Sequence, residues 1–255
     1  MPVLLIAGGS RGIGASTARL AARDGYDVAV NYVSNEKAAA DVVAAVQAAG
    51  RKAIALQGDM SREDDIERVF DEAARALGPV THFVHSSGIA GKNSKLADAS
   101  AETMRAVVEV NLLGALLCSR AAVNRMSTAK GGKGGAIVLL SSIAAVTSGA
   151  GEYVFYAAAK AAVDVLALGL AREVVKEGIR VNAVRPGVTD TEIHAPGRLE
   201  RITPLLPMGR PGTPDEIAEG ILFLLSDAAS YVTGSVLNVA GGRWRPALRS
   251  ALACL

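Results

Sequence analysis

Short β-type runs alternate with longer helical patterns along almost the whole chain, and this rhythm constrains its fold most strongly. Strands are expected at 2–7, 27–32, 52–57, 81–86, 135–142, 179–184 and 235–241. Helices are expected from 13 to about 24, at 35–50, at 62–77, around 101–127, around Tyr156 and at 216–226. Strands that alternate with helices predict an α/β protein, in which helices cover both faces of a parallel sheet.

The domain organisation is simple. The chain has 255 residues, which is enough for the core of one α/β domain. No repeat, low-complexity tract or linker interrupts the alternation, so we expect one domain at 1–242 and a short tail at 243–255. The tail is basic and part apolar; packing on a neighbouring subunit and disorder are both open for it.

Composition argues against several classes of protein. Half of the residues are hydrophobic, a fifth are charged and the net charge is +2, which fits a globular protein without a nucleic-acid partner. Cys118 and Cys254 stand far apart without ligand-like neighbours, so we expect no disulfide framework and no metal site, and we place Cys118 in the core. The first apolar run is unlike a signal peptide, and no stretch approaches the roughly 20 apolar residues of a membrane span. We therefore expect a cytoplasmic protein without a membrane partner.

A glycine-rich turn follows the first expected strand. It reads AGGSRGIG, with Gly8, Gly12 and Gly14 in the pattern G-x-x-x-G-x-G. Glycine lets a backbone turn tightly and approach a ligand, and the helix that follows offers N–H groups to a pyrophosphate. A plain tight turn is the alternative interpretation, but the position after the first strand of an alternating series favours nucleotide binding.

Tyr156 and Lys160 are four residues apart in EYVFYAAAK, so they share one face of the expected helix. A free tyrosine has a pKa near 10, and a neighbouring ammonium favours the phenolate and lowers that pKa. A surface pair is the alternative, although the surrounding alanines argue against it. Tyr153 is a rival phenol, but Ala157 stands four residues after it, where no ammonium can tune it.

The glycine pattern and the downstream Tyr-x-x-x-Lys together resemble the short-chain dehydrogenase/reductase family, over essentially the whole chain up to Gly242. Other motifs at the family's places are Gly58-Asp59, Asn111 in VEVNLLG, Ser141-Ser142, RPG at 185–187 and GSVLNVAGG at 234–242. The resemblance implies a Rossmann-type, doubly wound, seven-stranded parallel sheet. It also implies an NAD(P)(H)-dependent oxidoreductase that interconverts a carbonyl and an alcohol; a catalytically silent nucleotide-binding sensor or scaffold is the alternative.

The resemblance also implies the site residues. The expected catalytic residues are Asn111, Ser142, Tyr156 and Lys160. The expected cofactor-binding residues are Gly8, Ser10, Arg11, Gly12, Ile13, Gly14, Ser34, Asp59, Met60, Gly88, Tyr156, Lys160, Pro186, Gly187, Thr189 and Thr191. Tyr156 is the expected general acid/base, Ser142 bonds the substrate oxygen, and Lys160 binds the nicotinamide ribose. Asn111 is expected to hold a water of a proton relay, with a purely structural hydrogen bond as the alternative.

Three details depart from the family pattern or leave a choice. Strand alternation points Ser141 and Ser142 to opposite faces of the sheet. We choose Ser142 as the catalytic serine because the second serine of this pair is usually the catalytic one in the family. The distance in sequence from Ser142 to Tyr156 is then one residue longer than the commonest family spacing. The segment 85–88 reads His-Ser-Ser-Gly in place of Asn-Asn-Ala-Gly. We expect its histidine to be a satisfied strand-end residue. Ala7 stands where the family often has threonine.

NADP(H) is favoured over NAD(H) as the cofactor, with NAD(H) possible. An enzyme of this fold that uses NAD usually has an acid at the end of its second strand, to bond the ribose 2′-hydroxyl. Here that strand ends in Asn31, Tyr32, Val33 and Ser34, with no acid before Glu36. By resemblance, Arg11 and Ser34 are the contacts for a 2′-phosphate.

The segment 192–212 is rich in proline and glycine and, by resemblance, forms part of a substrate lid at about 188–212. Arg198 and Arg201 would suit an anionic substrate there, but arginines on such a helix are usually solvated, and an exposed position is also expected for His194. The substrate stays open among a 3-oxoacyl-carrier, a sugar and a general ketone. By resemblance we expect a homotetramer, with a dimer as the second choice. It would pair the long helices around 101–127 and 157–171, and also the last helix and strand.

Overall fold

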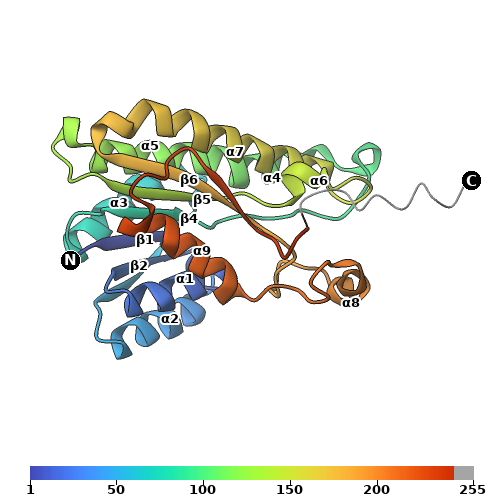
Figure 1. Cartoon of the computed structure of the whole chain (residues 1–255), viewed down its shortest axis with the longest axis horizontal. Coiled ribbons are helices and arrows are strands. Elements are labelled where there is room, and N and C mark those ends of the chain that lie inside the picture. Colours follow the sequence, from blue (N-terminus) through green and yellow to red (C-terminus); the bar gives the residue numbers. More distant parts are fainter. Residues whose placement is uncertain (244–255) are drawn as a thin grey trace, which may run out of the picture.

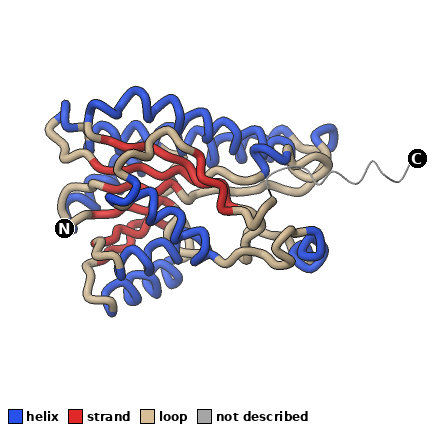
Figure 2. Tube along the Cα trace, in the orientation of Figure 1, coloured by secondary structure: helices blue, strands red, loops and turns tan. Residues whose placement is uncertain are grey.

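Seven parallel strands form one sheet in the order β3-β2-β1-β4-β5-β6-β7 (Figures 1 and 2). The computed structural model describes residues 1–243. The strands are β1 (Val3–Ala7), β2 (Asp27–Tyr32), β3 (Ala53–Gln57), β4 (His82–His85), β5 (Gly135–Leu140), β6 (Ile179–Pro186) and β7 (Val236–Val239). The predicted strands and the doubly wound sheet are thereby confirmed. Cys254 and all but the first residue of the predicted tail, 243–255, lie outside the described residues.

Helices cover both faces of the sheet (Figure 1). They are α1 (Gly12–Arg23), α2 (Glu36–Ala48), α3 (Glu63–Leu77), α4 (Ala101–Val108), α5 (Gly114–Met126), α6 (Ala144–Thr147), α7 (Val154–Val174), α8 (Arg198–Ile202) and α9 (Pro214–Leu225). Short 3₁₀ turns lie at Leu96–Asp98, Thr128–Lys130, Val175–Glu177, Thr203–Leu205 and Asp227–Ala229. One face is covered by α1, α2 and α9, and the other by α3, α5 and α7.

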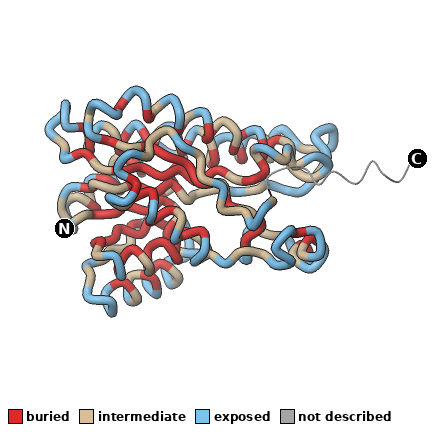
Figure 3. Tube along the Cα trace, viewed as in Figure 1, coloured by how far each residue is buried: buried red, intermediate tan, exposed pale blue. Residues whose placement is uncertain are grey.

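The sheet is buried on both sides because successive residues of its strands point into two separate cores. In β1, Val3 and Leu5 join the core under α3, α5 and α7, whereas Leu4 and Ile6 join the core under α1, α2 and α9. This two-sided burial explains why the strands read as nearly continuous apolar runs instead of alternating ones. Figure 3 shows the buried residues concentrated along the strands and the inner sides of the helices.

The strand order reverses between β1 and β4, which are neighbours in the sheet. In open α/β sheets, ligands bind at the carboxyl ends of the strands where the order reverses. The glycine-rich turn after β1 and the segment after β4 meet there, because a Cβ at Gly8 would lie 2.9 Å from the backbone nitrogen of Ser87. The fold therefore brings two of the predicted motifs to the same edge.

The predicted helix around 101–127 is interrupted. A π-helical turn at Glu109–Leu113 separates α4 from α5 and carries Asn111. The stretches Ala101–Met126 and Val154–Glu177 are also long and apolar enough to cross a membrane by length and composition, so the expectation that no stretch approaches that length is wrong. Both contribute to the layer that covers the sheet, where apolar side chains are needed for the core.

Candidate active site

The glycine-rich turn, Gly8–Gly14, is held by close backbone packing. A Cβ at Gly14 would lie 2.2 Å from the carbonyl oxygen of Gly8, so only glycine fits at that point of α1. Gly8 and Gly12 have positive φ angles of 73° and 50°, which glycine adopts without strain. The side-chain amide oxygen of Asn31 accepts from the backbone N–H of Gly8 at 3.2 Å, which ties the turn to the end of β2.

The turn leads into the amino end of α1, where Arg11 is the N-cap residue and its side chain makes no capping hydrogen bond. The first N–H groups of a helix have no intrahelical acceptor, and the helix dipole favours an anion at this end. The site therefore suits a pyrophosphate group.

The other predicted cofactor residues are spread along the same edge. Ser34 is exposed beyond β2, and Met60 is buried. Asp59 accepts hydrogen bonds from the backbone N–H of Ser61 at 2.9 Å and from its hydroxyl at 2.7 Å. The carboxylate of Asp59 therefore closes its own turn after β3.

Ser141 and Ser142 play different roles just beyond β5. The hydroxyl of Ser141 is buried and donates to the backbone oxygen of Lys160 at 2.9 Å, which anchors α7 to the strand. The hydroxyl of Ser142 accepts from the backbone N–H of Ala144 at 3.1 Å, and Ser142 lowers the pKa of Tyr156. Ser142 is thus the serine that influences the phenol, whereas Ser141 is bonded to the backbone of α7.

Tyr156 and Lys160 lie one turn apart on α7, and the Lys160 Nζ is 5.9 Å from the centre of the Tyr156 ring. Burial raises the pKa of Tyr156 to about 12, and the influence of Ser142, which lowers this pKa, is smaller. Burial also lowers the pKa of Lys160 to about 8, and its ammonium donates to the Leu140 backbone oxygen at 2.8 Å. The expected lowering of the phenol pKa is therefore not seen, because desolvation outweighs the other influences.

The π-helical turn places Asn111 beside Lys160. The side-chain amide of Asn111 donates to the backbone oxygens of Ile89 at 2.8 Å and Val107 at 2.9 Å. A Cβ at Gly88 would lie 2.7 Å from Asn111 Oδ1 and 3.3 Å from Lys160 Nζ, so glycine leaves room for both groups. Asn111 Oδ1 is buried without a hydrogen-bond partner among the described residues. Since a buried acceptor is costly when unpaired, this oxygen suits a bound water.

The surroundings of His85 in the structure differ from those that the sequence led us to expect. Its ring is buried at the end of β4, and neither ring nitrogen has a hydrogen-bond partner in the described part of the chain. Burial is the main cause that lowers the pKa of His85 to about 3. The nearby positive charge of Lys160 also lowers it. The expectation of a satisfied strand-end histidine is therefore wrong. The ring is neutral and lies on the same side of the sheet as the Phe83 ring, 6.4 Å from its centre.

The loop after β6 begins the lid, 188–212, and continues the site. Gly187 packs against Ala240, where a Cβ would lie 2.7 Å from the Ala240 Cα, and Pro186 ends the strand. Thr189 is buried and donates to the Gly187 oxygen at 3.2 Å. Thr191 Cγ2 lies 3.3 Å from where a Cβ would stand on Gly12, so the lid reaches the glycine-rich turn.

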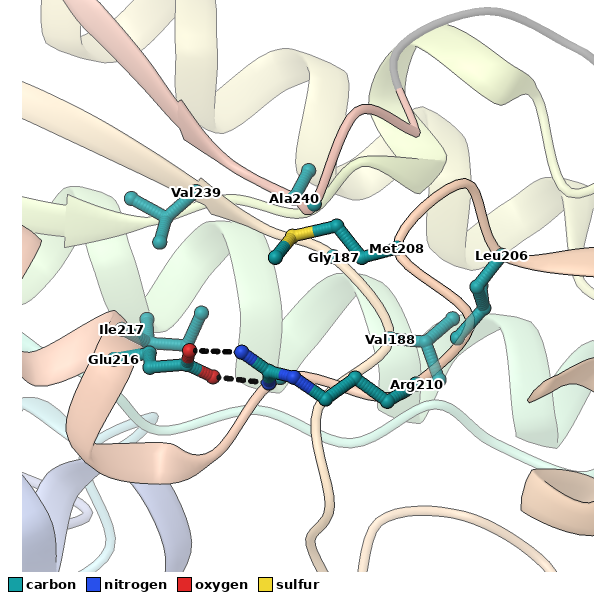
Figure 4. Close-up of a pocket in the computed structure, with 11 residues that line it drawn as sticks. Gly187, Val188, Leu206, Met208, Arg210, Glu216, Ile217, Val239 and Ala240 are labelled. Atoms are coloured by element: carbon teal, nitrogen blue, oxygen red, sulfur yellow. Dashed lines mark hydrogen bonds and ion pairs between the residues drawn. The ribbon is translucent and has the colours of Figure 1, made fainter.

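Two ion pairs fasten the lid to its neighbours from exposed positions. Arg11 pairs with Glu192 of the lid at 2.7 Å. Arg210 pairs with Glu216 of α9 at 2.6 Å, and this pair lies at one side of a cavity of about 120 Å³ (Figure 4). Apolar side chains such as Met208 and Val239 line the rest of the cavity, and none of the predicted catalytic residues does. The cavity therefore lies between the lid, α9 and β7, and no expected catalytic residue lines it.

Sequence reasoning missed a cluster around Arg198. Its guanidinium donates to Glu152 at 3.1 Å, to His194 Nδ1 at 2.9 Å and to the Tyr153 hydroxyl. The Tyr153 ring packs edge-on against Tyr156, with 5.6 Å between centres. Arg198 and the half-buried His194 are thus not the solvated residues that we expected, whereas Arg201 is exposed as expected. The composition of a short lid helix carries no signal of which arginine faces inward.

Comparison with known proteins identifies the family. The family model described as enoyl-(acyl carrier protein) reductase matches residues 7–243. The chain belongs to the short-chain dehydrogenase/reductase family. It is 46% identical over 247 residues to YgfF, an uncharacterised oxidoreductase of Escherichia coli strain K12, covering 95% of this chain and 100% of YgfF.

Two further relatives extend this family likeness. The chain is 39% identical to the cis-4-hydroxycyclohexanecarboxylate dehydrogenase of Sinomonas cyclohexanicum, covering 94% of this chain and 95% of that one. A crystal structure of a dehydrogenase/reductase from Sinorhizobium meliloti 1021 superposes with a TM-score of 0.88 at 32% identity, covering 95% of this chain and 94% of that one. Family membership implies a nicotinamide cofactor and a dehydrogenase or reductase role.

Proposed function

We propose that this member of the family interconverts a carbonyl and an alcohol with NADP(H), and that Tyr156 is its general acid/base. The observation that carries the proposal is the placement of Tyr156 and Lys160 one turn apart on α7, with the Lys160 Nζ 5.9 Å from the centre of the Tyr156 ring. Ser142, just beyond β5, lowers the pKa of the same phenol. Asn111 Oδ1 and the Lys160 Nζ both approach Gly88, where a Cβ would lie 2.7 Å and 3.3 Å from them. A silent nucleotide-binding protein has no need of all four groups in one place.

The residues divide the work of carbonyl reduction. With a raised pKa, the Tyr156 hydroxyl holds its proton at neutral pH and donates it to the substrate oxygen as negative charge develops there. The Ser142 hydroxyl bonds the same oxygen and stabilises its charge. Lys160, with a lowered pKa, can pass a proton onward, and a water on Asn111 Oδ1 would connect it to solvent. In the reverse direction the phenolate is the base.

The residues present fit a dinucleotide. The positive φ of Gly8 and the lack of room for a Cβ at Gly14 leave backbone instead of side chains around the amino end of α1, where a pyrophosphate would lie. Thr189 and Thr191 would cover the nicotinamide end. When bound, the nicotinamide supplies or accepts the hydride.

The preference for NADP(H) rests on charge at the end of β2. The sequence has no acid at the end of β2 before Glu36 to bond a 2′-hydroxyl, and Ser34, an expected phosphate contact with Arg11, is exposed. Arg11 would exchange its exposed partner Glu192 for a 2′-phosphate, which costs little because exposed ion pairs are worth at most about 1 kcal/mol. One charge-assisted contact then favours NADP(H) by about 10- to 100-fold.

The assembly is a second part of the proposal. Apolar side chains remain exposed on the helices that we expect to pair, namely Val108, Leu113, Leu116, Val165 and Leu168. Such a surface is costly on a monomer, so we propose a homotetramer with a dimer as the second choice. Light scattering at micromolar concentration checks this, and a stable monomer contradicts it.

The function is tested by following NADPH and NADH absorbance with a panel of ketones, sugars, 3-oxoacyl thioesters and alcohols. Turnover of a carbonyl or an alcohol with either cofactor is expected, and tight cofactor binding without any turnover would favour the silent sensor. The cofactor preference is tested by binding both reduced cofactors to wild type and Arg11→Ala at fixed salt. Equal affinities in wild type, or an equal loss for both cofactors in the variant, would contradict the preference.

A further inference from the structure

Arg198 is an unusual cation for a lid. It is 7% exposed and lies in the first turn of α8, whereas the side chain of Arg201 on the same helix is 66% exposed. Buried guanidinium groups are costly unless they are paired and fully hydrogen-bonded. The surroundings of Arg198 therefore have to compensate for its burial.

That compensation is incomplete. The two terminal nitrogens of Arg198 bond Glu152, Tyr153 and His194, but its Nε is buried with no hydrogen-bond partner among the described residues. The contacts also fix His194 as the neutral tautomer, because its Nε2–H donates to the Thr189 oxygen at 2.9 Å and its Nδ1 accepts from Arg198. The Nε–H of the guanidinium is thus left for another acceptor.

The net charge of this cluster also favours the binding of an anion. The Glu152 carboxylate is shared by two arginines, at 3.1 Å from Arg198 and 3.5 Å from Arg201. These three groups together carry one net positive charge. A carboxylate that approached Arg198 would therefore complete the charge balance, and Glu152 would keep Arg201 as its partner.

The cluster lies beside the reactive phenol. The Arg198 guanidinium stacks over the Tyr153 ring at 5.4 Å, and that ring meets the Tyr156 ring edge-on at 5.6 Å. The Tyr153 ring therefore separates a substrate group bound at Arg198 from one bound at Tyr156. A substrate with its carbonyl at Tyr156 would reach Arg198 with a substituent several bonds away.

We propose that Arg198 is a specificity-determining residue that binds a carboxylate on the substrate, so that the enzyme acts on oxo and hydroxy acids. The assignment of oxo and hydroxy acids as substrates rests on the proposed function. The binding of a carboxylate by Arg198 does not depend on it. A guanidinium fork matches a carboxylate with two parallel N–H donors, one of which is the unpaired Nε.

The test compares benzoate with benzamide, which share a shape and differ in charge. Isothermal titration calorimetry is run with and without NADPH on wild type, Arg198→Met, Arg198→Lys and Arg172→Met. Arg198→Met keeps Glu152 paired through Arg201, and Arg172→Met removes the same charge from an exposed position on α7. Arg198→Lys keeps the positive charge but loses the two parallel N–H donors of the guanidinium. It is the second variant in case Arg198→Met does not fold.

Wild type and Arg172→Met are expected to bind benzoate about 10- to 100-fold more tightly than benzamide. The ratio is expected to fall close to one in Arg198→Met and to an intermediate value in Arg198→Lys. No preference for benzoate in wild type, or a preference that survives both Arg198 variants, would overturn the proposal. Failure to bind NADPH would instead contradict the proposed function. In that case the benzoate preference measured without cofactor would still test carboxylate binding by Arg198.

Discussion

The glycine-rich turn and the lid stand at the same edge of the sheet but are held by opposite means. Backbone atoms in close contact hold the turn, such as the approach of Gly14 to the Gly8 oxygen. Side chains hold the body of the lid, through the pairs of Arg198 with Glu152 and Arg210 with Glu216 and through a small apolar cluster of Val188, Ile202 and Leu206. The base of the lid is also closed by backbone bonds, between Val188 and Gly212 and between Asp190 and Gly212.

This difference separates what is fixed from what can change. A Cβ at Gly14 would lie 2.2 Å from the Gly8 oxygen, so this position of the turn accepts only glycine. A lid held by ion pairs keeps its shape with many different side chains, and each choice alters what the substrate meets. The cofactor half of the site is thus specified by glycine positions and the substrate half by side-chain chemistry.

The largest expected effect separates the two regions directly. Gly14→Ala forces a backbone shift in the glycine-rich turn and is expected to lower the free energy of unfolding by about 3 kcal/mol or more, or to prevent folding. Gly197→Ala in the lid meets nothing within 4 Å and is expected to cost about 1–2 kcal/mol from its positive φ alone. Urea denaturation at one protein concentration checks both.

Gly169→Ala on α7 is the control for this pair. It meets nothing within 4 Å and has no positive φ, so it is expected to be neutral or slightly stabilising. A Gly14→Ala variant as stable as Gly169→Ala would contradict the difference between the two regions.

The second prediction concerns the buried ammonium behind the reactive phenol. The pKa of Lys160 is about 8 when folded, against an ordinary 10.5, so between these values the unfolded chain holds a proton that the folded protein has released. Stability therefore rises with pH across this window, because the cost of burying the charge is removed. Relative to Lys160→Met, wild type is expected to gain about 2–3 kcal/mol between pH 7 and pH 10.

Urea denaturation at several pH values measures this gain. Tyr156 interferes little, since its raised pKa of about 12 affects stability only above pH 10. Lys176→Met, at an exposed position, is the control and should follow the wild-type pH dependence. A constant difference between wild type and Lys160→Met from pH 7 to 10 would show that the ammonium is not buried as described.

The smallest effect is expected in the lid. Arg210 and the Thr213 N–H lower the pKa of Glu216 to about 2, so any stability it adds is present above its ordinary value of 4.5 and is lost as pH falls toward 2. Because the pair is exposed to solvent and salt, Glu216→Gln is expected to leave the urea midpoint at pH 7 almost unchanged. A loss as large as that of Gly14→Ala would place the lid among the rigid parts of the fold.

Much of the fold could be predicted because local sequence and global structure agree. The apolar runs became strands, and Gly8, Gly12 and Gly14 lie at a turn that demands glycine. The π-helical turn at Asn111 could not be predicted, because it depends on the packing of Asn111 between Ile89 and Val107 and not on helix propensity.

The electrostatics were less predictable than the positions. The spacing of Tyr156 and Lys160 correctly places them on one face of α7, but the direction of the phenol pKa depends on burial, which spacing does not contain. Arg198 and Arg201 have the same residue type on the same helix, and only the fold decides that one is buried and the other exposed. The sequence likewise shows His85 without showing that its ring nitrogens lack hydrogen-bond partners within residues 1–243.

The central claim is that the Tyr156 hydroxyl carries the proton of the reaction, whereas the cofactor is held mainly by other groups. Its most direct test is Tyr156→Phe, measured both for kcat on the best substrate of the panel and for the Kd of the reduced cofactor. We expect kcat to fall by about 100- to 10,000-fold, as removal of a general acid implies, with the Kd changed by no more than about twofold. A kcat within a factor of a few of wild type, in a variant that binds the cofactor normally, would contradict the claim.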